Sequence, residues 1–376
     1  MKNRTFHYGL IQSSYWLSYL PLFAYATTFL LSVGYSNTSI GLLLALANLS
    51  SIALQSFLAQ KVDSGKLAMK AVMLAQGLVI LTMSLLIHLK PFLGFYYIML
   101  VSLMSLQPFV NALSISCLQQ GMRLDFGLAR GMASLTYSLS SFALGALMVK
   151  WGVAISPLAG MLFISFHLMT VISFDFPNSR IVSEEKTESK GVFRRYPFLP
   201  LFLLSVILTF FGYNMFHNYL VHLIRYLGGS EKSLGLAIGI SAFAEVPVMF
   251  LFTKISRRFP VKNLLRLSAS FFLIKALLDL FSTNIYSIYL NQLTNALTFG
   301  LFMPASIYFL SKAMGQQDTA KGQALLTSAI IAGNVLASLV GGLVMDLYGI
   351  RSLMSLVAII EVFALILMLF SLSKEV

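Results

Sequence analysis

Long runs of apolar residues, separated by short polar segments, dominate the chain. A helix that crosses a bilayer needs about 20 mostly apolar residues, and continuous runs disfavour the alternating pattern of a membrane β-barrel. The pattern predicts an all-α integral membrane protein with twelve transmembrane helices. We expect them near residues 9–33, 38–60, 67–88, 92–120, 127–149, 154–176, 198–226, 232–254, 263–282, 285–311, 322–345 and 351–372.

The only long hydrophilic segment lies in the middle of the chain, at about 177–197, and contains SEEKTESKGVFRR. Its charged, Ser-rich composition is typical of a flexible linker. It predicts an N-terminal six-helix bundle (1–176), a cytoplasmic linker and a C-terminal six-helix bundle (198–376). The bundles also share a short repeat, RGMASLT at 130–136 and KGQALLT at 321–327. Two parallel repeats of six helices, with substrate bound near the midplane, are the architecture of major facilitator transporters.

Composition and charge agree with a membrane protein. Of the 376 residues, 58% are hydrophobic and 10% are charged, which excludes a water-soluble enzyme. A net charge of +13 would favour nucleic-acid binding in a soluble protein, but cytoplasmic loops of membrane proteins are rich in Lys and Arg. On the predicted topology, 20 of the 26 Lys and Arg residues fall on the side of the N-terminus and 5 on the other. We therefore expect a multi-pass protein of the cell membrane with both termini cytoplasmic and no nucleic-acid partner.

Several motifs resemble the major facilitator superfamily along the full length of the chain. More narrowly, the chain resembles its proton-symporter branch of oligosaccharide, nucleoside and phenylpropionate permeases. The stretch DFGLAR at 125–130 is similar to an acidic-Phe-Gly-Arg-Ala-Arg motif of lactose permeases, and AQKVDSGK at 59–66 is a shortened form of the loop between spans 2 and 3. The Lys262-Asn263 pair with Lys275, and AEVP at 244–247, add weaker matches.

This resemblance implies a monomeric transporter that works by alternating access. It places Arg130 on the sugar-holding arginine of the permeases, and Asp63 and Lys66 in a cytoplasmic gate. The sequence departs from the permeases at the carboxylate partner of that arginine, which falls near Ala112, and at the span-10 proton relay, which falls on Thr294 and Leu297. The resemblance therefore implies neither lactose as substrate nor that relay.

Four ionisable residues lie well inside predicted spans, where a charge costs about 2.5–3.5 kcal/mol. Glu245 lies midway along span 8, and a lone buried carboxyl there could bind and release a proton; the alternative is a permanently neutral structural acid. Lys275 and Asp279 are spaced i, i+4, which favours an ion pair that either stabilises span 9 or opens during transport. Glu361 lies on span 12, which is often peripheral in this superfamily, so we expect a structural position for it.

Polar and aromatic side chains on several spans are candidates for a substrate site. Asn214 and Asn218 share one face of span 7, and polar groups in membrane helices usually face the bundle interior. Arg130 could bind hydroxyls or a carboxylate through two parallel hydrogen bonds. The alternative is a positive charge that anchors its span at the cytoplasmic face, as Lys321 would at the equivalent position of the repeat. Aromatic rings of span 1 could stack on a sugar or an aromatic acid, although Trp and Tyr also occur at membrane interfaces. The proposed set comprises Arg130, Trp16, Tyr19, Asn214, His217, Asn218, Gln55 and Asn291.

Other chemistries have no signature here. There is no phosphate loop, no GxSxG elbow, no HExxH and no CxxC motif, so we expect no enzyme, no metal and no cofactor. The sequence predicts a secondary transporter for proton-coupled uptake of a small polar organic solute, such as a sugar, a nucleoside or an aromatic acid. The alternative is an efflux proton antiporter of the same fold, although span 5 lacks the proline-containing motif typical of such exporters.

Overall fold

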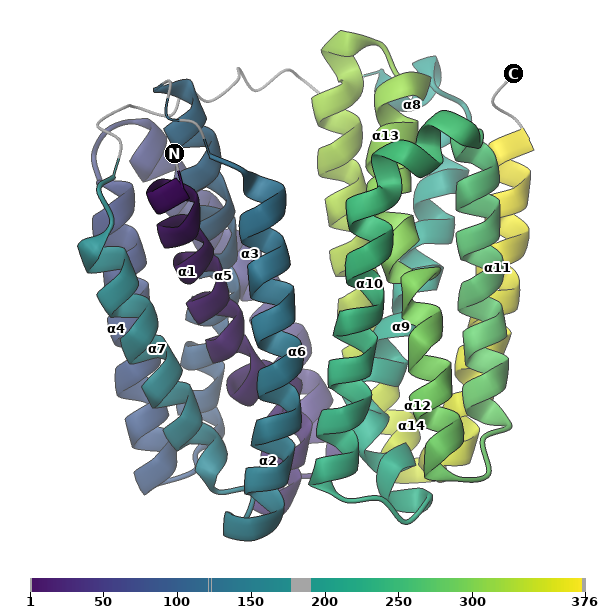
Figure 1. Ribbon diagram of the computed structural model, residues 1–376. Coiled ribbons are helices and arrows are strands. Elements are labelled where there is room, and N and C mark those ends of the chain that lie inside the picture. The colour runs from purple at the N-terminus through teal and green to yellow at the C-terminus, as the bar shows by residue number, and fades with distance from the viewer. Residues whose placement is uncertain (1, 121, 123, 177–190, 374–376) are drawn as a thin grey trace. The chain divides into compact units, whose positions relative to one another are not determined.

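The computed structural model describes residues 2–120, 122, 124–176 and 191–373, and in that part of the chain the regular structure is entirely helical (Figure 1). Nine of the described helices are long and apolar enough to cross a membrane. The helix α11 (Val261–Leu280) falls outside that number and carries four charged residues. The helix α14 (Gln316–Ser373) contains two arms. The architecture is consistent with twelve spans.

The chain divides into two compact units, Met1–Glu185 and Lys186–Val376. Unit 1 holds α1 (Lys2–Tyr19), the π-helix η1 (Leu20–Ala24), α2 (Ala26–Ser32), α3 (Asn37–Asp63), α4 (Met69–Leu89), α5 (Leu93–Gln119), α6 (Phe126–Trp151) and α7 (Ile155–Ser173). Unit 2 holds α8 (Val192–Arg195), α9 (Leu199–Tyr226), α10 (Glu231–Arg258), α11, α12 (Ile285–Gln292), the 3₁₀ helix η2 (Leu293–Ala296), α13 (Phe299–Ala313) and α14. Each unit has its own apolar core.

Several helices begin where a polar side chain caps the free backbone N–H groups. The side chain of Ser36 accepts from the Ser39 N–H ahead of α3, and Asp125 Oδ1 accepts from the Leu128 N–H ahead of α6, at 2.9 Å. Ser230 and Ser233 cap the start of α10 reciprocally. These caps set the boundaries between spans, which the apolar runs alone locate only to within a few residues.

The first span is interrupted at η1, which contains Pro21. Proline lacks a backbone N–H and breaks regular helical bonding, so carbonyl groups here need other donors. The Ser156 hydroxyl donates to the Pro21 carbonyl at 2.6 Å, and the Tyr96 hydroxyl donates to the Leu22 carbonyl at 2.8 Å. The break is thus held by α5 and α7, and it lies directly after the aromatic part of α1.

The tenth span is interrupted in the same way, at η2 between α12 and α13. The Ser268 hydroxyl of α11 donates to the Thr298 carbonyl at 3.0 Å, and the Asn295 carboxamide oxygen accepts from the Thr298 hydroxyl at 3.2 Å. Discontinuous membrane helices commonly form binding sites in transporters. At the breaks in spans 1 and 10, backbone carbonyl groups inside the apolar bundle therefore bond to side chains of neighbouring helices.

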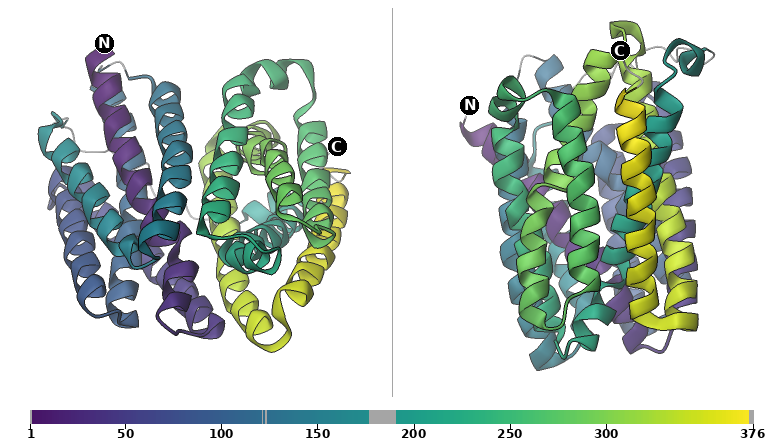
Figure 2. Two further views of the ribbon diagram at one scale, coloured as in Figure 1. Left: turned by 60° about the horizontal axis from the view of Figure 1, so that its bottom comes forward. Right: turned by 90° about the vertical axis from the view of Figure 1, so that its right-hand side faces the viewer.

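Helix α14 reverses direction at Gly349, whose φ of 74° suits glycine and few other residues (Figure 2). Its two arms correspond to the predicted spans 322–345 and 351–372. The Arg351 guanidinium donates to the Leu280 carbonyl at 2.5 Å and to the Ser282 carbonyl at 3.4 Å. The reversal is thereby fixed against the end of α11, which brings the second arm alongside α9 and α11.

The predicted linker, 177–197, lies partly outside the described residues. Its last part contains the short helix α8, whose Arg195 pairs with Asp318 at the start of α14, at 2.5 Å. Tyr196 also donates to Asp318, at 3.3 Å, and accepts from the Gly315 N–H at 2.9 Å. Lys321 adds a second ion pair with Asp318 at 3.1 Å. The end of the linker region is thus bonded to unit 2.

Candidate functional site

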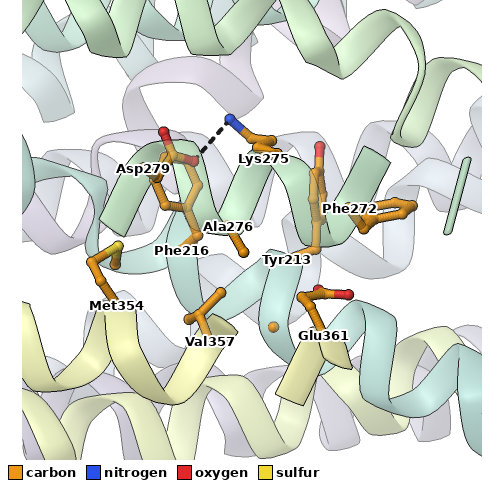
Figure 3. A pocket seen from close by; sticks show the side chains of 10 residues that line it. Tyr213, Phe216, Phe272, Lys275, Ala276, Asp279, Met354, Val357 and Glu361 are labelled. Carbon is orange, nitrogen blue, oxygen red and sulfur yellow. Dashed lines mark ion pairs between the residues drawn. The ribbon is translucent and has the colours of Figure 1, made fainter. Parts of the chain in front are cut away.

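A small polar pocket lies inside unit 2, between α9, α11 and the second arm of α14 (Figure 3). Its walls are mostly apolar and aromatic, and one basic and two acidic side chains line it: Lys275, Asp279 and Glu361. The space open to the centres of water-sized molecules is about 20 Å³, which is enough for a water molecule. The pocket as described therefore has room for a water molecule, which could exchange protons with the side chains that line it.

The pair Lys275–Asp279 is the electrostatic centre of this pocket. The i, i+4 spacing brings the Lys275 ammonium 3.2 Å from the Asp279 carboxylate, with the side chains 5% and 1% exposed. In Figure 3 the ammonium points at that carboxylate. Asn291 donates to Asp279 Oδ1 at 3.3 Å, and Lys275 donates to Gln292 Oε1 at 3.3 Å. The predicted candidates Lys275, Asp279 and Asn291 are therefore joined in one buried network.

Aromatic rings complete the surroundings of Lys275. Its ammonium lies 4.5 Å from the centroid of the Phe216 ring, a cation–π contact that partly replaces lost hydration. Side-chain nitrogens of Gln292 and His217 are buried without a hydrogen-bond partner among the described residues. Unused donors and acceptors close to a charged pair leave the network able to take on a further partner.

Glu361 is the feature that the sequence interpretation placed wrongly. We left it out of the candidate site because span 12 is often peripheral, but the side chain is 2% exposed and lines the same pocket as Lys275 and Asp279. The reversal at Gly349 turns this face of α14 toward α9, where Gly212 leaves the space that the carboxyl occupies. Which face of the last helix points inward depends on tertiary packing. The available signal was one acid among Ile, Val, Phe and Leu, because an intramembrane acid is by default a functional candidate.

Glu245 belongs to a second polar cluster of unit 2, on α10 and η2. Its carboxylate accepts from the Asn295 amide at 3.3 Å, and the same amide donates to Ser241 and, at 3.5 Å, to the Tyr213 hydroxyl. Gly300 of α13 lies against the Glu245 backbone, because a Cβ there would be 3.1 Å from the Glu245 Cα. Tyr213 also lines the pocket, so one side chain borders both clusters.

Arg130 and Trp16 form the corresponding feature of unit 1. The guanidinium of Arg130, near the start of α6, lies 4.2 Å from the Trp16 ring centroid on α1. The Tyr19 and Tyr137 rings lie 5.1 and 6.2 Å from that of Trp16. Both Trp16 and Tyr19 are only partly buried. The structure thus brings three predicted candidates (Arg130, Trp16, Tyr19) together just before the break in span 1.

The remaining candidates have separate surroundings. The His217 ring lies next to the pocket, tilted against the Tyr213 ring with 4.2 Å between the ring centroids. The Asn218 amide donates to Ser338 of α14 at 3.2 Å. In the described part of the chain, no hydrogen bond joins Asn214 or Gln55 to another candidate. Asp63 ends α3 and is half-buried, and the exposed Lys66 follows in the loop.

The described residues contain no group of three or more His, Cys, Asp or Glu side chains arranged to hold a metal ion. The ionisable groups of unit 2 lie instead in an apolar helical interior, where each charge is costly unless it is paired. Such an arrangement can exchange protons and rearrange ion pairs, and the Arg130 cluster can hold a polar or aromatic solute.

Comparison with known proteins assigns the family. No curated protein matches the chain by sequence. Among solved structures, the nucleoside transporter NupG superposes with a TM-score of 0.78 at 13% identity, covering 99% of this chain and 98% of that one. A bacterial homologue of the human lysosomal transporter Spinster, inward-facing and occupied, gives 0.71 at 13% identity over 100% and 97%. A peptide transporter POT variant in complex with alafosfalin gives 0.72 at 13% identity over 98% and 93%.

These likenesses show a shared fold, and the sequence itself gives a more direct assignment. The family model described as the MFS_1 like family matches residues 16–357, nearly the whole chain. Together with the apolar helices, the match identifies a multi-pass membrane protein with the fold predicted for two six-helix repeats. The chain therefore belongs to the MFS_1 like family, a transporter family of the major facilitator superfamily.

Proposed function

We propose that this protein is a secondary active transporter that couples proton movement to the uptake of a small polar organic solute. Alternating access of its two six-helix halves would carry out the transport. The observation that carries the proposal is the buried Lys275–Asp279 pair beside Glu361 in a pocket whose other walls are mostly apolar. Charges in such positions cost free energy in the bilayer and mark ion and substrate pathways.

The proposed coupling residues are Glu245, Lys275 and Asp279. Glu245 would bind the proton, because its carboxylate lies within the membrane-spanning helix α10 and accepts a hydrogen bond from the neutral Asn295 amide. Protonation of Asp279 would release Lys275 from its 3.2 Å ion pair. A proton can thereby change the hydrogen bonds between α11 and α12, the first part of the interrupted tenth span.

The proposed substrate residues are centred on Arg130, Trp16 and Tyr19, with Gln55, Asn214, His217, Asn218 and Asn291 as further contacts. The guanidinium can bind two oxygens of one carboxylate or of neighbouring hydroxyls, and the Trp16 ring beneath it offers a stacking face. This chemistry fits a sugar, a nucleoside or an aromatic acid. The likeness of the fold to a nucleoside transporter and a peptide transporter supports a small polar solute.

The proposed setting is the cell membrane, with both termini cytoplasmic and a single chain as the working unit. The excess of Lys and Arg on one side of the predicted topology supports this orientation. Asp63 and Lys66, at the end of α3 and in the loop that follows, would then lie on the cytoplasmic side, where they would act as a gate.

A competition uptake screen tests the function. Purified protein is reconstituted in proteoliposomes, an acidic exterior is imposed, and radiolabelled sugars, nucleosides and aromatic acids are offered with unlabelled competitors. We expect accumulation of one class, and loss of accumulation when a protonophore collapses the gradient. Extrusion of hydrophobic drugs with no solute uptake would instead support the efflux antiporter, and uptake indifferent to the gradient would refute proton coupling.

A further inference from the structure

Glu361 differs from Lys275 and Asp279, because its carboxyl group makes no hydrogen bond or ion pair with any residue that the structure describes. Its side chain is 2% exposed. Gly212 lies directly against this carboxyl, and a Cβ at that position would collide with Oε1. The surrounding residues therefore leave space for the Glu361 carboxyl but supply no positive charge to compensate a carboxylate.

The nearby charges do not supply the missing counter-charge. The Lys275 ammonium is bonded to Asp279 at 3.2 Å and to Gln292 at 3.3 Å, and in Figure 3 it points away from α14 toward Asp279. An isolated carboxylate in an apolar interior costs far more than the neutral acid. Glu361 accordingly holds its proton while the Lys275–Asp279 pair is closed.

The titratable groups that face this pocket come from three helices. Tyr213 comes from α9, Lys275 and Asp279 from α11, and Glu361 itself from α14. His217 lies one turn beyond Tyr213 on α9, with its ring 4.2 Å from the Tyr213 ring. Helix α13 also packs against α14 but lines no part of the pocket.

We propose that Glu361 is a proton-binding site of this transporter, loaded in the state described here and emptied when the pocket opens to water. In the release step the carboxyl O–H bond breaks, the proton passes to a water molecule, and the carboxylate remains. The pocket has room for such a water. The inference rests on the proposed proton-coupled function and adds a site on span 12, separate from the Glu245 cluster.

The test is infrared difference spectroscopy of the full-length protein in lipid nanodiscs, titrated from acidic to alkaline pH without substrate. A protonated carboxyl absorbs as a carboxylic-acid C=O stretch, which disappears on ionisation. Wild type is compared with Glu361→Gln and with Gly212→Ala, which displaces the carboxyl and keeps the acid. Glu231→Gln is the matched control, because Glu231 pairs with Arg225 at the surface.

We expect a wild-type C=O band that persists at neutral pH and is lost on alkaline titration. The difference spectrum of Glu361→Gln should lack the Glu361 component of this band. The band should be unchanged in Glu231→Gln and shifted in its titration midpoint in Gly212→Ala. A band unaffected by Glu361→Gln, or one that never titrates, overturns the inference. If Glu361→Gln does not fold, an unshifted midpoint in Gly212→Ala overturns it as well. Failure of the proposed function would appear separately, as wild-type uptake indifferent to a pH gradient.

Discussion

The Lys275–Asp279 pair gives the sharpest quantitative prediction. Asp279→Asn removes the negative charge and leaves the Lys275 ammonium 5% exposed. Removing one partner of a buried pair typically costs about 3–5 kcal/mol, because the other charge stays buried. Lys275 would retain Gln292 Oε1 at 3.3 Å and the Phe216 ring at 4.5 Å, so we place the loss near the lower limit, about 3 kcal/mol.

A second substitution, which completes a double-mutant cycle, shows whether the loss of stability comes from the unpaired charge or from altered packing. Lys275→Met in the Asp279→Asn background removes both charges and keeps similar side-chain volumes. Replacing both members of a buried pair is often neutral or stabilising, so the double variant should be more stable than Asp279→Asn alone by about 2 kcal/mol or more. Non-additivity of this sign identifies a stranded charge as the cause.

The assay is the free energy of unfolding from SDS titration in lipid–detergent micelles. Glu231→Gln serves as the matched control, because the Arg225–Glu231 pair has a similar distance, 3.0 Å, but lies at the surface. Exposed pairs contribute about 0.2–1 kcal/mol, so the free energy of unfolding of this variant should fall by less than about 1 kcal/mol. The reasoning is refuted if Asp279→Asn loses no more free energy of unfolding than Glu231→Gln. It is also refuted if the loss in the double variant equals the sum of the losses in Asp279→Asn alone and Lys275→Met alone.

Three further predictions concern other parts of the chain. Burial raises the pKa of the Asp318 carboxyl, but hydrogen bonds from Lys321 and Arg195 outweigh it and leave the pKa below its usual value. The stability from this group is therefore present above the ordinary carboxyl range and lost as pH falls through the lowered pKa. The melting-temperature gap between wild type and Asp318→Asn should be open at neutral pH and close in acid; a pH-independent gap contradicts this. Trp16→Leu removes the ring that contacts the Arg130 guanidinium, a contact of about 0.5–2 kcal/mol. This variant should raise the half-saturation concentration for substrate about 2- to 30-fold, and Trp16→Phe should stay closer to wild type. Equal half-saturation concentrations for both variants would count against the site. Gly333→Ala should lower the melting temperature more than Gly77→Ala, because the new Cβ lies 2.6 Å from the Ile207 carbonyl oxygen of α9 in the first case and against the tip of the Leu168 side chain in the second; the reverse order contradicts this packing.

Local patterns predicted much of the fold. The apolar runs predicted the helices because a bilayer requires about 20 apolar residues per span, and the repeat at 130–136 and 321–327 predicted two related halves. The i, i+4 spacing predicted the Lys275–Asp279 pair, since residues four apart on a helix are neighbours. These features depend only on geometry within one helix or on the solvent that surrounds it.

Features that depend on contacts between helices were not predictable in the same way. The break at η1 is held by hydroxyls of Tyr96 and Ser156, which lie far along the chain. The inward position of Glu361 follows from the reversal at Gly349 and from the space at Gly212. The spacing of apolar and polar residues within one helix reveals neither contact. For this reason the acid on span 12 was left out of the predicted site.

The central claim is that acids within the membrane-spanning helices of unit 2 couple protons to transport, and Glu245→Gln tests it most directly. The measurement compares two rates in proteoliposomes with the solute found by the uptake screen: accumulation driven by an acidic exterior, and counterflow exchange without a gradient. We predict that Glu245→Gln keeps counterflow and loses accumulation. The glutamine amide can still form hydrogen bonds with its neighbours, but it cannot bind and release a proton. Accumulation at the wild-type rate in this variant would contradict the account.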